Sequence, residues 1–473
     1  MNRILTFFLL IFTLLIPSKG ISQYVINKQE LAGSWMGKLS VSSVTLRIVY
    51  NLSLTEKDSI TATLDSPDQG AKNIKIGPVT LNGKDIKILA PVMMAEYSGT
   101  IVNDTLIEGS FRQAGMTFPL SLTKLTVPIT FKRPQEPVPP FPYMTEDLVF
   151  INEKFNINLA GTLTIPKGEG PFPAVVLITG SGAQNRNEEV FGHKPFMVIA
   201  DHLTRNGIAV LRYDDRGIGK SEGNYSTATT ADLATDAEAA FKFLKTNQKI
   251  NSELIGLAGH SEGGIIAPMV AAANREVAFI ISLAGTGVRG DKVLHRQNED
   301  LWLASGIAEA DVMKSISINK KLYAVVRKEA DDKKALEKMT SVYKKELAKK
   351  ESSPEKISEE LERFRQSSQA IVSPWFRYFL RTDPSLYWKK VKCPVLALNG
   401  EKDLQVAADV NLPAIEKALR SGGNRLIKTI AFPDLNHLFQ HCKTGTIAEY
   451  NGIEETFSPE VMKIMTEWIL GLR

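Results

Sequence analysis

Short runs in which apolar and polar residues alternate occupy the first part of the chain. They include residues 44–54, 59–64, 84–89 and 105–111, and turn residues separate them. A period of two is typical of antiparallel strands with one buried face. Asn82 and Gly83 fit a tight hairpin turn between two of the runs. We therefore expect residues 23–126 to form a small all-β unit, with one antiparallel sheet closed into a barrel.

The pattern changes in residues 144–473, where continuous apolar runs alternate with segments of helical periodicity. The apolar runs are 174–179, 208–213, 254–259, 278–284, 395–399 and 426–432, preceded by two others at 148–152 and 159–165. Continuous apolar runs are typical of parallel strands that helices cover on both faces. The sequence thus predicts an α/β unit with a mostly parallel sheet, in which the two earlier runs form an antiparallel edge.

Two segments interrupt this organisation. Residues 127–143 contain six prolines, a density that favours an extended, semi-rigid linker between the two units. Residues from about 286 to 390 contain charged helical runs followed by a cluster of aromatic residues that includes Trp375. We interpret this second segment as a helical cap inserted between two strands of the sheet, where it would cover an apolar pocket.

Composition and the first residues of the chain limit the possible classes of protein. The 473 residues are 43% hydrophobic and 23% charged, the balance of a soluble globular protein. The net charge of +5 is spread along the chain, so we expect no nucleic-acid partner. The apolar run from Ile4 to Ile16 is shorter than the roughly 20 residues of a membrane-spanning helix. Residues 1–22 are therefore predicted to be a signal peptide, and the mature protein to be periplasmic or secreted without stable membrane insertion.

Cysteine is too scarce to build a disulfide framework. Cys393 and Cys442 are the two cysteines of the chain. In an exported protein a single bridge between them is chemically possible, and the sequence leaves that question open.

The strongest chemical motif is Gly259-His260-Ser261-Glu262-Gly263-Gly264. It follows a predicted buried strand and precedes a helical run at residues 265–273. A serine between small residues at such a junction is typical of a nucleophile elbow, in which glycines leave room for a sharp turn that presents the hydroxyl. Ser261 is therefore the predicted nucleophile.

A serine nucleophile requires a base and an acid, which follow it along the chain in this type of fold. His437 lies in the loop after the last predicted strand, and Asp403 in the loop after the strand at residues 395–399. We predict that His437 is the base and that Asp403 fixes its tautomer. His441 remains an alternative base, and Glu401 and Asp434 remain alternative acids.

The developing oxyanion needs two backbone N–H donors. One normally comes from the residue after the nucleophile and the other from the loop after the first parallel strand. These positions are Glu262 and Ser181, with Gly182 as an alternative to Ser181. The nearby Gly217-Ile218-Gly219 has neither dinucleotide-binding nor Walker spacing, so Asp215 and Arg216 are interpreted as structural residues that brace the loops.

Three motifs carry a resemblance to a known superfamily: residues 178–182, residues 213–221 and the elbow at residues 259–264. From about Arg133 onward the chain resembles the α/β-hydrolases, specifically exported carboxylesterases related to the serine aminopeptidase (hydrolase 4) group. The resemblance implies an eight-stranded sheet, preference for short acyl esters, and no cofactor or metal. Thr179-Gly180 departs from the His-Gly of many relatives. Separately, Gly33-Ser34-Trp35 resembles the opening of lipocalin-like barrels, with Trp35 expected in the core.

These observations lead to a main hypothesis and two alternatives. The main one is hydrolysis of a small acyl ester through an acyl-enzyme on Ser261. The first alternative is a serine aminopeptidase or amidase that uses the same triad, because the sequence identifies the attacking group better than the leaving group. The second is a protein that binds a lipid or other ligand in its β barrel and carries a vestigial hydrolase unit. The sequence does not indicate an oligomeric state.

Overall fold

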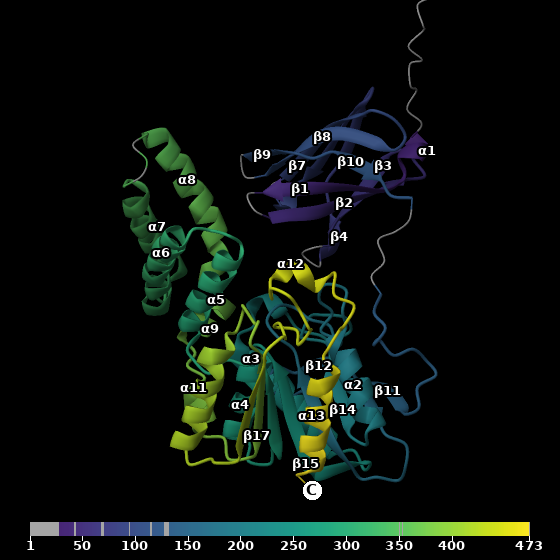
Figure 1. Ribbon diagram of the computed structural model, residues 1–473, viewed down its shortest axis with the longest axis vertical. Coiled ribbons are helices and arrows are strands. Elements are labelled where there is room, and N and C mark those ends of the chain that lie inside the picture. Colours follow the sequence, from purple (N-terminus) through teal and green to yellow (C-terminus); the bar gives the residue numbers. More distant parts are fainter. Residues whose placement is uncertain are drawn as a thin grey trace, which may run out of the picture.

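The computed structural model describes residues 28–41, 44–67, 71–93, 95–113, 116–126, 132–349, 351 and 353–472. The predicted signal peptide, residues 1–22, and the first part of the predicted linker, residues 127–131, lie outside the described residues. Two sheets form the frame of the molecule (Figure 1). Within the described ranges, no helix has the length and apolar character needed to cross a membrane.

The N-terminal sheet is antiparallel and has ten strands. After the short helix α1 (Lys28–Leu31), the strands are β1 (Gly33–Val41), β2 (Val44–Leu54), β3 (Ile60–Ser66), β4 (Ala71–Lys75), β5 (Val79–Asn82), β6 (Asp85–Ala90), β7 (Ala95–Ile101), β8 (Leu106–Gln113), β9 (Met116–Pro119) and β10 (Leu122–Lys124). Their order is β4-β3-β2-β1-β10-β8-β7-β6-β5, with β9 paired to β8.

This sheet is a half-barrel, which corrects the prediction of a closed barrel. Its hydrogen-bonded path runs from β4 to β5, and in the described residues no ladder joins these two ends. The end strands have only five and four residues and thus offer few backbone groups for closure. Trp35 is fully buried in the core, as expected, and its Nε1 donates to the Leu31 carbonyl at 2.8 Å.

The second sheet has eight strands in the order β11-β12-β14-β13-β15-β16-β17-β18. They are β11 (Met144–Asn152), β12 (Ile157–Ile165), β13 (Phe172–Ile178), β14 (Ala209–Tyr213), β15 (Ile250–His260), β16 (Phe279–Leu283), β17 (Val395–Gly400) and β18 (Ile427–Phe432). β11 and β12 pair antiparallel, and β13 to β18 pair parallel. The predicted parallel sheet with an antiparallel edge is confirmed.

Helices cover both faces of this second sheet. One face packs against α3 (Thr230–Lys245), α4 (Gly263–Ala273) and α11 (Ala408–Ser421), and the other against α2 (Pro195–Arg205) and α13 (Pro459–Leu470). Successive residues of β13 enter different cores, because Val176 belongs to the first and Val175 and Leu177 to the second. Side chains on a strand alternate between its faces, so a continuous apolar run is what two covered faces require.

A helical insertion lies between β16 and β17, in the region where the sequence predicted a cap. It contains α5 (Gly290–Ala304), α6 (Glu309–Lys328), α7 (Asp332–Leu347), α8 (Pro354–Ser367), η4 (Ser368–Val372), α9 (Pro374–Arg381) and α10 (Ser385–Trp388). Its own core includes Val326, Met339 and Leu380. We refer to this insertion, α5 to α10, as the cap.

The described part of the linker is held firmly on the second unit. Arg133 donates to the carbonyl of Asn451 at 2.9 Å, and Gln135 donates to the carbonyl of Phe457 at 2.8 Å. The Asn451 side chain in turn donates to the carbonyl of Pro67 in the N-terminal unit. Asn451 follows α12 (Ile447–Tyr450), which lies between the two sheets in Figure 1.

Candidate active site

Ser261 occupies the sharp turn between β15 and α4. Its φ is 53°, in the left-handed region that residues other than glycine rarely adopt. Its backbone N–H donates to the carbonyl of Leu283, in β16, at 2.8 Å, which fixes the turn on the neighbouring strand. Backbone strain of this kind persists only where the surrounding structure holds it, and it is common at functional sites.

The flanking glycines are required by close packing. A Cβ atom built on Gly259 would lie 2.0 Å from the carbonyl oxygen of Gly263. One built on Gly263 would lie 2.2 Å from the carbonyl oxygen of Ile178, in β13. Both distances are far below contact, and the obstructing atoms are backbone. The Gly-x-Ser-x-Gly spacing is thus the physical condition for the turn that presents Ser261.

His437 and Asp403 form a buried pair on the two loops that follow β18 and β17. The Nδ1 atom of His437 lies 2.7 Å from Oδ2 of Asp403, and the two side chains are 7% and 0% exposed. The other carboxylate oxygen accepts the backbone N–H groups of Gln405 and Val406, both at 2.8 Å. The carboxylate is therefore fixed in position, and it favours the His437 tautomer with the proton on Nδ1 and a free lone pair on Nε2.

Ser261 adjoins in sequence a residue that contacts this pair, but Ser261 itself is not hydrogen-bonded to the pair. The ring of His260, the residue before Ser261, has its centroid 4.8 Å from that of His437. Among the described residues, no hydrogen bond joins Oγ of Ser261 to the His437 ring. In active sites without substrate such bonds are often long and shorten in the complex.

The alternative bases and acids are engaged elsewhere. His441 is 57% exposed and its Nδ1 lies 2.8 Å from a Glu455 oxygen. Asp434 is 68% exposed and forms an ion pair with Lys402 at 2.9 Å. Glu401 is also exposed. Of the candidates, only His437 and Asp403 form a buried pair with each other.

The loop after β13 passes directly beside Ser261. A Cβ built on Gly180 would lie 3.2 Å from the Ser261 Cβ. The N–H of Gly180 donates to Oε1 of Glu188 at 2.6 Å, and that of Gly182 donates to the Tyr225 hydroxyl at 2.9 Å. In contrast, within the part of the chain that the structure describes, the N–H of Ser181 has no acceptor.

Like the N–H of Ser181, the backbone N–H of Glu262 has no acceptor among the described residues. Ser181 and Glu262, the two predicted oxyanion donors, thus keep their N–H groups available, whereas Gly182 does not.

The side chain of Glu262 connects the elbow to the cap. Its Oε1 accepts the indole N–H of Trp375, in α9, at 2.8 Å and the hydroxyl of Thr230 at 2.6 Å. Burial raises the pKa of this carboxyl above its ordinary value, although both hydrogen bonds oppose the shift. The sequence indicated a role only for the backbone of Glu262, because a motif does not show which side chain of a distant helix will reach it.

Asp215 and Arg216 brace the loops, as predicted. The Asp215 carboxyl accepts the hydroxyl of Thr179 at 2.8 Å and the N–H of Gln184 at 2.9 Å. Burial raises its pKa to about 8. Arg216 forms a buried ion pair with Asp236 at 2.7 Å.

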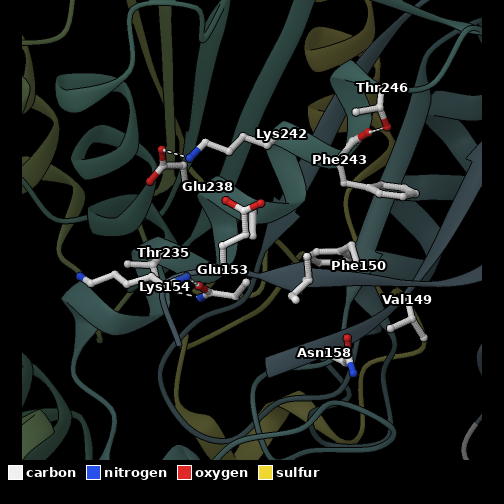
Figure 2. A pocket seen from close by; sticks show the side chains of 13 residues that line it. Val149, Phe150, Glu153, Lys154, Asn158, Thr235, Glu238, Lys242, Phe243 and Thr246 are labelled. Atoms are coloured by element: carbon white, nitrogen blue, oxygen red, sulfur yellow. Dashed lines mark hydrogen bonds and ion pairs between the residues drawn. The ribbon is translucent and has the colours of Figure 1, made fainter. Parts of the chain in front are cut away.

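A hollow at the β11 edge of the eight-stranded sheet contains none of the predicted site residues. It has a volume of about 770 Å³ and lies between β11 and α3 (Figure 2). Phe150 and Phe243 form part of its wall, and Lys242 is ion-paired with Glu238 at its side. Because β11 is the first strand of the sheet order and β15 the fifth, the hollow is separate from the Ser261 turn.

Cysteines and metal-binding groups add little to this site. Cys393 and Cys442 are both free thiols, so the possible bridge does not form. Among the described residues, no group of three or more His, Cys, Asp or Glu side chains is arranged to hold a metal ion.

A mixed eight-stranded sheet, a strained serine between strand and helix, and a buried His-Asp pair after the last two strands define the α/β-hydrolase class. Residues 156–427, more than half of the chain, match the family model described as X-Pro dipeptidyl-peptidase (S15 family), and the protein belongs to this family. The α/β-hydrolase resemblance is thereby confirmed, and the narrower relation to the serine aminopeptidase group stays a prediction.

The individual proteins that this chain resembles share less than a third of their aligned residues with it. The esterase EstD of Thermotoga maritima is 27% identical over 286 residues, which are 59% of this chain and 58% of that esterase. The match thus spans less than two thirds of the relative. An esterase of Pyrococcus furiosus has a similar structure with 16% identity and a TM-score of 0.40, covering 70% of this chain and 93% of its own. Est1E from Butyrivibrio proteoclasticus, bound to ferulic acid, has 18% identity and a TM-score of 0.39, covering 69% and 98%.

Proposed function

We propose that this protein hydrolyses carboxylic esters through an acyl-enzyme on Ser261. One observation carries the proposal: the 2.7 Å bond between buried His437 and Asp403, on loops that follow two adjacent strands, beside the strained turn of Ser261. A serine hydroxyl is a poor nucleophile unless an oriented base takes its proton. The geometry supplies the orienting carboxylate and leaves the other ring nitrogen free for that task.

The reaction follows from these positions. Oγ of Ser261 attacks the acyl carbon while Nε2 of His437 takes its proton, and the N–H groups of Ser181 and Glu262 donate hydrogen bonds to the oxyanion. The alcohol then leaves with the proton from His437, and the acyl group stays on Ser261. Water, activated by His437, attacks the acyl-enzyme in the reverse sense and releases the acid. Asp403 accepts the Nδ1–H of His437 and stabilises the imidazolium in both steps.

The substrate class is inferred from the cap. Ile265 and Met269 of α4 pack against Phe379 of α9 and against Val406, in one apolar cluster that Trp375 borders. Ile265 lies four residues after Ser261, and Val406 three after Asp403. We propose that a short acyl chain binds against this apolar cluster. The esterase EstD, 27% identical, supports ester cleavage.

Peptide or amide hydrolysis by the same residues is the second candidate, because the family to which the chain belongs is described as a dipeptidyl-peptidase. Parallel assays separate the two candidates. We expect p-nitrophenyl acetate and butyrate to be cleaved faster than X-Pro and other aminoacyl p-nitroanilides. Anilide turnover that far exceeds ester turnover would reverse this ranking.

We also propose that the protein is exported, from the apolar run at residues 4–16 and the small residues that follow it. Expression of the full chain with N-terminal sequencing of the secreted or periplasmic product tests this. An intact Met1 on protein that stays in the cytoplasm would contradict it.

The decisive test of the chemistry is Ser261→Ala. We expect ester turnover to fall by at least ~10⁴-fold and labelling by a fluorophosphonate probe to disappear, because the attacking oxygen is lost. The circular dichroism spectrum should be unchanged. Ser226→Ala, at an exposed serine, is the control and should keep both activities. Undiminished turnover in Ser261→Ala would refute the proposal. A wild type without turnover or labelling, whose N-terminal unit binds lipid, would favour the ligand-binding alternative.

A further inference from the structure

A second buried histidine, besides His437, lies next to the proposed nucleophile in the chain. His260 is the last residue of β15, immediately before Ser261. Its Nδ1 lies 2.9 Å from Oε1 of Glu188, and its Nε2 lies 2.9 Å from the backbone carbonyl of His437. The His260 and Glu188 side chains are 8% and 4% exposed. The pair therefore connects the elbow, the loop after β13 and the loop that carries His437.

The hydrogen-bond partners determine the protonation of His260. A carbonyl oxygen can only accept, so Nε2 must carry a proton to bond with His437. Oε1 of Glu188 accepts the N–H of Gly180, and we assign it as an acceptor towards Nδ1 as well. Both ring nitrogens are then donors, which makes His260 an imidazolium beside the carboxyl group of Glu188.

Electrostatics agree with this assignment. Burial alone would lower the pKa of His260, but the charge and hydrogen bond of Glu188, the His437 carbonyl and the charge of Asp403 together raise it above its ordinary value. A buried charge is tolerated where it is paired and hydrogen-bonded. Here the positive ring has a carboxylate on one side and a carbonyl on the other.

The contacts of this pair reach two predicted functional groups without touching the reacting atoms. The His260 bond to the His437 carbonyl fixes the backbone of the base. The Glu188 bond to Gly180 fixes the peptide next to Ser181, whose N–H is a proposed oxyanion donor. One rigid unit thereby sets the spacing between base and oxyanion donor.

We infer that His260 and Glu188 are positioning residues, an imidazolium–carboxylate pair that holds the His437 loop and the Ser181 loop in register around Ser261. The inference rests on the proposed function of Ser261. If the pair had only a structural role, its loss would reduce the fraction of folded protein. A positioning role predicts in addition that kcat per folded molecule falls.

The test uses the full chain and five variants. Glu188→Gln keeps the shape but removes the charge, and His260→Gln removes the ring. We expect each to lower kcat on p-nitrophenyl butyrate, and the rate of fluorophosphonate labelling per folded molecule, by ~10- to 100-fold, because displacements below 1 Å have effects of this size. KM should change by less than about threefold. The double variant should be no slower than the slower single variant, because both changes break one unit.

His202→Gln provides the control. His202 is a half-buried histidine on α2, and among the described residues its ring makes no hydrogen bond with the loops around Ser261. The change should leave kcat and the labelling rate per folded molecule within about twofold of wild type. Glu188→Asp, which keeps the charge, should fall between wild type and Glu188→Gln.

Nuclear magnetic resonance of the ¹⁵N-histidine-labelled wild type at pH 8 supplies a readout that does not depend on the variants folding. Both ring nitrogens of His260 should show imidazolium shifts. In Glu188→Gln that folds, these shifts should be lost. A neutral His260 in the wild type, or wild-type kcat in folded Glu188→Gln and His260→Gln, would overturn the inference while Ser261 labelling persists. Failure of the proposed function is different, since the wild type itself would then be neither labelled nor active.

Discussion

The two sheets of this molecule arrange their loops in opposite ways. In the second sheet, β13, β15, β17 and β18 are parallel, so the loops that follow them all emerge at the carboxyl ends of the strands. Residues as distant in sequence as Gly180, Ser261, Asp403 and His437 gather there. The N-terminal sheet is antiparallel, so the connections between its strands alternate between the two ends of the strands. Parallel topology is thus what concentrates chemistry in one place.

The sheets also differ in how they are buried. β13 is buried on both faces except at its first residue, whereas β6 alternates between exposed and buried positions. A sheet covered on both faces offers a rigid base for loops, and a half-barrel offers a single core with an outer face in water. We therefore expect substitutions in the second unit to change chemistry and those in the first unit to change stability.

The largest expected effect tests the gathering of loops in the second unit. Asp403→Asn should lower kcat by roughly 10³- to 10⁴-fold, because an amide no longer fixes the Nδ1–H tautomer of His437 or stabilises the imidazolium. Steady-state ester hydrolysis measures it. Asp434→Asn, at the exposed acid after β18, is the control and should remain near wild type. If Asp434→Asn were the slower variant, the assignment of the acid would be wrong.

The next effect tests the first unit. Trp35→Ala should destabilise the N-terminal sheet by about 3–5 kcal/mol, because it removes the largest fully buried side chain of that core. Hydrogen exchange of residues 28–126, followed by mass spectrometry, measures the loss. Turnover of p-nitrophenyl acetate should stay within about twofold of wild type, since the triad lies in the other unit.

Trp35→Phe, which keeps most of the apolar volume, should be destabilised less. A parallel loss of ester turnover in Trp35→Ala would show that the two units are functionally coupled, through contacts such as that between Asn451 and Pro67. The contrast between the sheets would then hold for their architecture but not for their roles.

Much of the second unit could be predicted because its local signals agree. Continuous apolar runs, helix ends and the glycines around Ser261 each indicate the same strand-turn-helix order. His437 and Asp403 were predicted from chain order and from their places in the loops after two predicted strands, and the structure brings these two together at 2.7 Å. The closed barrel was wrong for a physical reason, since alternation predicts strands but does not say whether the end strands pair.

The rest depended on contacts that local patterns do not encode. Glu188 lies in an irregular loop, and nothing near it in the sequence indicates that it meets His260, 72 residues later. Trp375 was recognised as one of several aromatic residues in the cap, but its hydrogen bond to Glu262 spans 113 residues. The one available signal was His260 itself, a titratable residue inside the elbow motif for which the reaction scheme had no use.

A smaller effect concerns the pH dependence of stability in the second unit. Burial lowers the pKa of His193, in the second unit, from 6.5 to about 4. Between these values the unfolded chain binds a proton that the folded protein does not, so stability is lost as pH falls from 6.5 to 4. This group should cost up to about 3 kcal/mol at the acid end. Urea unfolding at several pH values should show a shallower slope for His193→Gln than for wild type. An unchanged slope would show that other groups cause the acid sensitivity.

The smallest expected effect concerns the contact between cap and elbow. Trp375→Phe keeps the aromatic ring of the apolar cluster but removes the indole N–H that Glu262 accepts at 2.8 Å. A single hydrogen bond of this kind contributes about 1 kcal/mol, so the cap should be held less firmly and KM for p-nitrophenyl butyrate should rise by roughly two- to fivefold. Because the triad and the N–H groups of Ser181 and Glu262 are untouched, kcat should change by less than about twofold. Phe376→Leu, at the neighbouring position in the cap, controls for general loosening. A fall in kcat with constant KM would instead place Trp375 among the residues that shape the elbow, and the cap would then belong to the machinery around Ser261 and not to the substrate pocket.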